Sequence, residues 1–129
     1  ARELGATPMA RIVGHATFAQ APEWFSTAPV GAVQKLLTKI GWEVKGVDLW
    51  EINEAFAVVP MAAMTELNIS HDVVNVNGGA CALGHPIGCS GARIIVTLIH
   101  ALKARGLKKG VATLCIGGGE ATALAIEVL

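Results

Sequence analysis

The sequence has no excess of charge of either sign and no long apolar run. Ten basic and ten acidic residues cancel, so the chain lacks the basic stripe of a nucleic-acid-binding protein and the polybasic segment of a membrane anchor. No apolar stretch approaches the roughly 18 to 20 residues that a membrane span needs, and no charged start followed by an apolar block indicates a signal peptide. We therefore expect a soluble protein whose partner is a small molecule or another protein, with no nucleic acid and no membrane.

Cysteine is also scarce. The three cysteines, Cys81, Cys89 and Cys115, are an odd number and show no CxxC spacing, which argues against a disulfide framework and a zinc site and favours a reducing cytoplasm. Cys81 and Cys89 each lie four residues from His85, a spacing that resembles metal ligands on a helix. Because glycine and proline interrupt this segment, we interpret both cysteines as small side chains that fill space, and we expect no metal.

The length of 129 residues, of which 53% are hydrophobic, is enough for one core of ordinary size. We therefore expect a single domain. The first residues, ARELG, include no initiating Met and resemble the last turn of a helix that ends at Gly5. This pattern predicts that the chain is a fragment that begins in mid-structure.

Hydrophobic periodicity predicts an α/β fold in which strands alternate with helices. The expected strands are 10–19, 47–53, 72–77, 110–116 and 122–129, and the expected helices are 30–41, 54–68 and 90–105. The order β-α-β-α-β-α-β-β implies right-handed crossovers and a mixed, mostly parallel sheet with helices on both faces. The two final strands, joined by a short glycine-rich turn, should pair antiparallel.

Functional groups gather in the loops that follow three of the predicted strands. In sheets of this kind ligands bind beyond the carboxyl ends of the strands. The loops at 53–56, 77–91 and 115–119 each combine a polar or reactive side chain with small residues, which allow backbone amides to approach a ligand closely. These loops are therefore the candidate site.

The same loops contain three motifs: NEAFA at 53–57, GGACALGHPIG at 78–88 and CIGGG at 115–119. In this order and at these intervals they resemble the C-terminal signatures of thiolases, most closely the acetyl-CoA acetyltransferase and β-ketothiolase branch. The likeness covers nearly the whole chain. The related condensing enzymes of fatty-acid synthesis have two histidines in this region, whereas this chain has Asn53, His85 and Cys115. The resemblance implies that the fold is one half of a thiolase.

The resemblance also implies a reaction: a reversible Claisen condensation of acyl-CoA molecules through an acyl-enzyme, with coenzyme A thioesters as substrates and no bound cofactor. His85 would be the general base that activates the nucleophilic thiol, since imidazole exchanges protons near neutral pH. Cys115 would be the second acid/base group, acting at the α-carbon. Asn53 would hold a water that stabilises one oxyanion together with His85, and the Gly117 amide would help to stabilise the other.

Ala55 and Phe56 would, by the same resemblance, line the pantetheine tunnel. Each of three residues also has an alternative, purely structural role. A Phe at a helix start is more often ordinary core, a single His often caps a helix or turn, and a Cys that ends an apolar strand, such as Cys115, is often a small buried hydrophobe.

The nucleophile of thiolases is a Cys in an N-terminal half that this sequence does not contain, and none of the three cysteines matches its motif. We therefore expect residues 1–129 to be a thiolase C-terminal domain that is inactive alone. Its expected partners are acyl-CoA, the N-terminal thiolase half and, because of apolar surface such as that of the helix at 90–105, further copies in a homo-oligomer. The alternative is a stand-alone acyl-CoA-binding or scaffold domain that retains the motifs.

Overall fold

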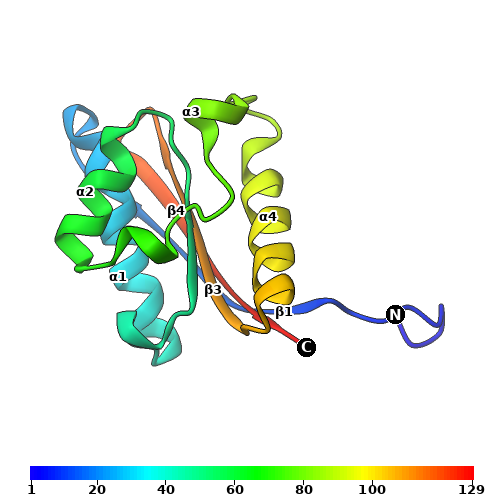
Figure 1. Ribbon diagram of the computed structural model, residues 1–129. Coiled ribbons are helices and arrows are strands. Elements are labelled where there is room, and N and C mark those ends of the chain that lie inside the picture. Colours follow the sequence, from blue (N-terminus) through cyan, green and yellow to red (C-terminus); the bar gives the residue numbers. More distant parts are fainter.

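Figure 1 shows the computed structural model, which describes residues 1–129, as one sheet with helices on both of its faces. The strands are β1 (Ala10–Ala19), β2 (Leu49–Ile52), β3 (Lys109–Ile116) and β4 (Glu120–Val128). The α-helices are α1 (Ala28–Ile40), α2 (Val58–Leu67), α3 (Ala80–Leu83) and α4 (Ser90–Arg105). Three short 3₁₀ turns, η1 (Pro22–Thr27), η2 (Val44–Gly46) and η3 (His71–Val73), complete the elements.

The strands lie in the order β1-β4-β3-β2. β2 pairs parallel with β3, and β4 pairs antiparallel with both β1 and β3. Three strands therefore run in one direction and only β4 opposes them. This confirms the prediction of a mixed sheet with mostly parallel strand directions and an antiparallel final pair. Because β4 lies between β1 and β3, only one of the three hydrogen-bonded pairs is itself parallel.

The strand predicted at 72–77 does not form. The segment begins with η3 and then makes a single parallel bridge between Val74 and Trp50. Asn75 follows in the left-handed region, at φ 48°, which ends the extended backbone. Its side chain then pairs with the edge of β2: Nδ2 donates to the Ile52 carbonyl at 2.8 Å, and Oδ1 accepts from the Ile52 N–H at 2.8 Å. An asparagine side chain therefore occupies the place of a further strand.

Helix boundaries follow the local signals closely. α4 has the predicted bounds, and α1 begins two residues before the predicted start. α2 was predicted from residue 54 but begins at Val58, because residues 53–57 form the loop that leaves β2. Pro60 then falls in the first turn of α2, where its missing N–H has no partner within the helix.

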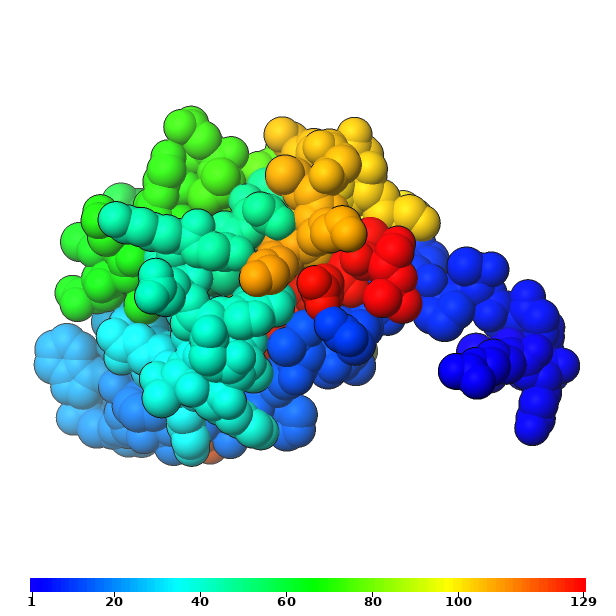
Figure 2. Space-filling view, turned by 90° about the horizontal axis from the view of Figure 1, so that it is seen from below, coloured from blue at the N-terminus to red at the C-terminus, as the bar shows by residue number.

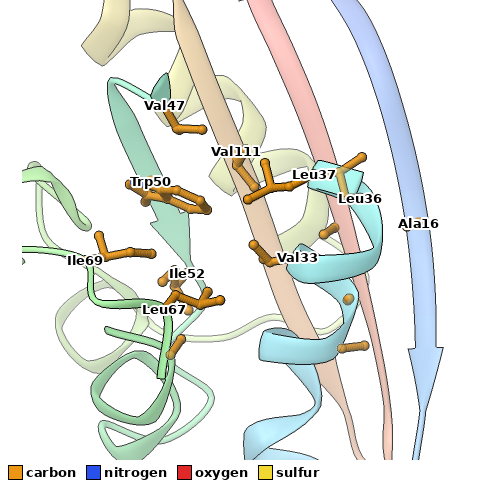
Figure 3. Packing of buried hydrophobic residues seen from close by; sticks show 14 of the residues in the cluster. Ala16, Val33, Leu36, Leu37, Val47, Trp50, Ile52, Leu67, Ile69 and Val111 are labelled. Carbon is orange, nitrogen blue, oxygen red and sulfur yellow. The ribbon is translucent and has the colours of Figure 1, made fainter. Parts of the chain in front are cut away.

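The core is divided between the two faces of the sheet. Figure 3 shows the cluster under α1 and α2, in which Leu36 and Val33 of α1 pack against Ile52, Trp50 and Val111 of the sheet. The opposite face is covered by α4. The residues of α4 buried against the sheet are Ile94, Leu98, Ala101 and Leu102.

The outer surface of α4 is only partly apolar. Val96 has an exposed fraction of 54%, and Ile95 and Ile99 are half-buried. The apolar surface expected on the helix at 90–105 is therefore reduced to a narrow patch, because three of the six large aliphatic residues of this helix already cover the sheet.

Residues 1–9 project from the body of the molecule in both Figure 1 and Figure 2 and are exposed. They form a turn and not the predicted end of a helix, although Gly5 has the expected positive φ of 63° and its N–H donates to the Arg2 carbonyl at 3.1 Å. The carbonyl of Met9 accepts from the N–H of Leu129 at 3.2 Å. The last residue before β1 therefore lies beside the end of β4.

Candidate active site

Asn53 and His85, predicted to act together, lie in contact. Asn53 follows β2 at its carboxyl end, is fully buried, and donates its backbone N–H to the Thr113 carbonyl at 2.9 Å. Its Nδ2 is 3.4 Å from Nε2 of His85. The side-chain oxygen Oδ1 is buried without any hydrogen-bond partner, which is costly for a polar atom unless a ligand or water completes the bond. The fold thus brings together two segments that are distant in the sequence.

His85 is held from its other side by the start of α4. Its Nδ1 lies 2.5 Å from Oγ of Ser90, the first residue of that helix, and the Ser90 hydroxyl also donates to the Pro86 carbonyl at 3.2 Å. His85 is half-buried and Ser90 is fully buried. Ser90 was not among the predicted site residues, although a serine at a predicted helix start is a recognisable signal of a hydroxyl engaged in local hydrogen bonding.

Glu54, the second residue of the NEAFA motif, joins the loop after β2 to two further segments. One carboxylate oxygen accepts from Nδ2 of Asn75 at 3.0 Å, and the other accepts from the backbone N–H of Cys81 at 3.0 Å. Gly79 lies so close that an added Cβ would stand 2.2 Å from this carboxyl group. Glu54 therefore anchors the start of α3, and a side chain at 79 would displace its carboxyl group from these hydrogen bonds.

A buried ion pair joins β2 to α4. Oε2 of Glu51 lies 3.1 Å from Nη1 of Arg93, while Oε1 of Glu51 is buried with no partner. Burial raises the pKa of Glu51 from 4.5 to about 7, although the Arg93 guanidinium acts in the opposite direction. Glu51 precedes Asn53 by two residues and Arg93 follows Ser90 by one helical turn. The pair therefore connects the two elements that position Asn53 and His85.

Cys115 lies near the carboxyl end of β3, opposite Ala121 of β4. It is buried and belongs to the cluster under α1 and α2. Burial raises the pKa of the Cys115 thiol, an effect partly offset by a backbone hydrogen bond, so the sulfur keeps its proton near neutral pH. No side-chain hydrogen bond joins Cys115 to Asn53 or His85, and the prediction that they serve one reacting centre stays a prediction.

Gly117 stands exposed in the hairpin loop between β3 and β4. Ala55 is half-buried and packs against the core under α1 and α2. Phe56 is 59% exposed, and its ring meets that of Phe25 edge-on with centroids 6.1 Å apart. The alternative that Phe56 is ordinary core is therefore wrong. These three residues border the loops that carry Asn53 and Cys115.

The interpretation of Cys81 and Cys89 as space-filling side chains is also wrong, because both are exposed. Cys81 lies in α3 and Cys89 lies in the loop between α3 and α4, and neither side chain packs into the core. No three His, Cys, Asp or Glu side chains lie close enough together to hold a metal ion. None of the helices has both the length and the apolar character that crossing a membrane requires.

Comparison with known proteins shows the family to which this chain belongs. A family model described as the C-terminal domain of thiolase matches residues 6–128. The chain belongs to the thiolase C-terminal domain family. A probable acetyl-CoA acetyltransferase of Dictyostelium discoideum is 57% identical over 129 residues, which are 100% of this chain and 31% of that protein.

Solved thiolase structures share the fold. The acetyl-CoA acetyltransferase of Bacillus anthracis is 51% identical with a TM-score of 0.96, covering 99% of this chain and 32% of its own. The Acat5 thiolase of Ascaris suum, solved in complex with coenzyme A, is 46% identical with a TM-score of 0.92, covering 99% of this chain and 33% of its own. The chain thus spans about a third of the length of the relatives that it matches.

Proposed function

We propose that this chain is the C-terminal catalytic domain of a thiolase of the acetyl-CoA acetyltransferase type, which condenses acyl-CoA molecules reversibly and cleaves 3-ketoacyl-CoA. The contact between Asn53 and His85 is the observation that carries the proposal, because an imidazole, a group that can act as a general base, lies beside a buried amide near the carboxyl end of β2. The names of the relatives support the same chemistry.

In the first half-reaction, His85 accepts the proton of a cysteine thiol supplied by the N-terminal part of the enzyme. The thiolate attacks the thioester carbonyl, the acyl group moves to the cysteine, and the coenzyme A thiolate leaves and takes up a proton. His85 is suited to this step because Nε2 faces Asn53 while Nδ1 is held by Ser90.

In the second half-reaction, Cys115 in its thiolate form removes a proton from the α-carbon of the incoming acetyl-CoA and becomes a neutral thiol. The carbanion attacks the acyl-enzyme, the new carbon–carbon bond forms, and the enzyme thiolate leaves. In the direction of cleavage Cys115 donates this proton. Because burial raises the pKa of the Cys115 thiol, the protonated form that can donate in this direction is favoured.

The buried oxygen of Asn53 supports its role at an oxyanion. Nδ2 of Asn53 and Nε2 of His85 face one another, and the unpartnered Oδ1 can accept from a water that these groups hold. The Gly117 amide would meet the other oxyanion, where the lack of a side chain leaves room for substrate. Ala55 and the exposed Phe56 would line the pantetheine tunnel.

The remaining two-thirds of a thiolase would supply what this chain lacks. Apolar side chains stand exposed around His85, including Leu83 at 60% and Ile87 at 88%, as expected of a surface that another part of the enzyme covers. We propose that the chain acts with the N-terminal thiolase half in a cytoplasmic homo-oligomer, uses coenzyme A thioesters without a bound cofactor, and is inactive alone.

Two variants of a complete enzyme that carries this domain test the division of roles. His85→Ala should lower the burst of acyl-enzyme formation from acetyl-CoA by about 100-fold or more, whereas Cys115→Ser should spare much of the burst and block carbon–carbon bond exchange. His100→Ala, at an exposed position on α4, is the matched control. A wild-type burst in the His85 variant would contradict the assignment.

Complementation tests the need for the missing part. The 129-residue chain should cleave no acetoacetyl-CoA, and a separately made N-terminal half that docks to it should restore some cleavage. Turnover by the chain alone would refute the proposal of an inactive fragment. Tight binding of coenzyme A to the chain alone, without complementation, would favour the stand-alone binding domain considered above.

A further inference from the structure

We propose that Ser90 is a positioning residue that holds His85 in the tautomer with the proton on Nδ1, so that Nε2 is the proton acceptor. The structural part of this inference stands on the hydrogen bonds alone, and its consequence for rate rests on the proposed function. The observation is a buried hydroxyl that contacts an imidazole nitrogen on one side and a backbone carbonyl on the other.

The direction of the first hydrogen bond follows from what each atom can offer. A carbonyl oxygen only accepts, so the contact between Ser90 Oγ and the Pro86 carbonyl at 3.2 Å uses the hydroxyl proton. A serine hydroxyl has one proton. With that proton directed to Pro86, the hydroxyl presents a lone pair to His85, and we infer that Nδ1 of His85 carries the hydrogen in the contact of 2.5 Å.

The opposite nitrogen has the matching environment. Nε2 of His85 faces the amide nitrogen of Asn53 at 3.4 Å, and an amide nitrogen can only donate. In the neutral ring, a proton on Nδ1 leaves the lone pair of Nε2 directed toward Asn53. Both neighbours of the ring thus favour the same tautomer, which is the one able to take a proton from a thiol at Nε2.

The fold keeps Ser90 in place. Ser90 is fully buried, so water does not compete strongly for its hydroxyl. The Pro86 carbonyl also accepts the backbone N–H of Ser90 at 2.9 Å, which closes the turn that carries His85 onto the helix. One helical turn later, Arg93 pairs with Glu51 of β2, so this end of α4 is fixed to the strand that leads to Asn53.

Nuclear magnetic resonance of the 129-residue chain labelled with ¹⁵N-histidine tests the tautomer directly. The chain has four histidines, and the His85→Gln variant identifies the signals of His85. Couplings from the ring nitrogens to the ring carbon-bound protons distinguish a protonated nitrogen from an unprotonated one. At a pH where the ring is neutral, we expect the proton on Nδ1. A proton on Nε2 would overturn the proposal.

Kinetics of a complete enzyme that carries this domain test the consequence. Ser90→Ala should lower kcat for acyl-enzyme formation by about tenfold or more, with KM little changed, because an unanchored imidazole samples the wrong tautomer and orientation. Ser90→Thr keeps the hydroxyl and should recover part of the rate. Ser70→Ala, which removes an exposed hydroxyl that caps η3, should leave the rate unchanged.

The possible outcomes separate the two proposals. A wild-type enzyme that forms no acyl-enzyme would refute the proposed function but leave the tautomer as measured. Wild-type kcat in the Ser90→Ala enzyme, together with a proton on Nδ1 of His85, would show that Ser90 does not position the base. Because the tautomer is measured in the unsubstituted ring, the test does not depend on how well the Ser90 variants fold.

Discussion

Replacing Glu51 by glutamine should remove the part of the pH dependence of stability that comes from the buried Glu51 carboxyl group. Burial raises the pKa of Glu51 to about 7 in the folded state, from 4.5 for a free carboxyl group. Between these two pH values the folded chain binds a proton at Glu51 more readily than the unfolded chain does. The free energy of unfolding contributed by this group is therefore fully present below about pH 4.5 and is lost as the pH rises to about 7.

The magnitude follows from the same pair of values. At about 1.4 kcal/mol per pKa unit, the loss amounts to about 3 kcal/mol. Solvent screening should reduce this free-energy difference only slightly, because the Glu51 side chain is only 2% exposed. The physical origin is that the Arg93 guanidinium approaches one carboxylate oxygen while the other stays buried without a partner. The gain from the ion pair is thus smaller than the cost of burying the charge.

Urea unfolding of the 129-residue chain, followed by circular dichroism from pH 4.5 to pH 8, measures this effect. Glutamine has the shape of the neutral acid, so Glu51→Gln should have nearly the wild-type free energy of unfolding at pH 4.5. Above pH 7 the variant should be more stable than the wild type, by up to about 3 kcal/mol. Glu43→Gln, at an exposed position, sets the background.

The Arg93→Met variant gives a second check on the same reasoning. Since Arg93 lowers the pKa of Glu51, its removal should enlarge the loss of stability with rising pH and move the loss to higher pH. A difference between wild type and Glu51→Gln that stays constant with pH, or that grows in favour of the wild type as the pH rises, would refute the assignment of a carboxyl group destabilised by burial.

Three further predictions concern packing, backbone and reactivity. Leu98→Ala, within the core under α4, should lower the free energy of unfolding by about 2–5 kcal/mol, whereas Val96→Ala on the exposed side of the same helix should cost less than about 1 kcal/mol in urea unfolding. Gly119→Ala should cost about 1–3 kcal/mol in the same assay, because φ is +99° and the added Cβ would stand 2.3 Å from the Gln20 carbonyl oxygen. Gly117→Ala, where nothing lies within 4 Å, is its control for stability. Iodoacetamide at pH 7.5 should modify the exposed Cys89 before Cys115, because burial both covers the Cys115 thiol and raises its pKa. Peptide mass spectrometry measures the two rates. Equal rates of modification would contradict the burial of Cys115.

Elements with strong local signals were predictable from the sequence. The apolar periodicity of 90–105 predicts α4 with its observed bounds, and its end is marked by Gly106 at φ 67°. The glycine-rich turn at 117–119 predicts the hairpin of β3 and β4. In each case the neighbouring residues along the chain carry the information, because helix caps and tight turns depend on local backbone geometry.

The segment at 72–77 shows where such reasoning fails. Its apolar residues predict a strand, but Asn75 turns the backbone and pairs its own side chain with Ile52. Asparagine is a common turn residue, yet its pairing partner is 23 residues away. The pattern of apolar residues at 72–77 could not show that the Asn75 side chain, and not a further strand, would pair with the backbone of Ile52.

The candidate site was likewise only partly predictable from the sequence. The motifs NEAFA, GGACALGHPIG and CIGGG indicate Asn53, His85 and Cys115 as candidate catalytic residues, because the residue types and their order are properties of the chain itself. Ser90 gives only the local signal of a serine at a helix start, and the contacts of Glu54 and the partner of Arg93 cannot be derived from the sequence, since they depend on atoms in other segments.

The sequence by itself determined most of the helices, strands and turns, such as the helix at 90–105 and the turn at 117–119, and which side chains are candidates to exchange a proton or meet an oxyanion. Only the tertiary structure decided that β4 lies between β1 and β3, that Asn53 meets His85, and that Glu51 is buried against Arg93. The physical reason is that secondary structure responds to neighbours along the chain, whereas burial, pKa and tautomer respond to neighbours in space, which the chain acquires only when its sheet and helices pack together.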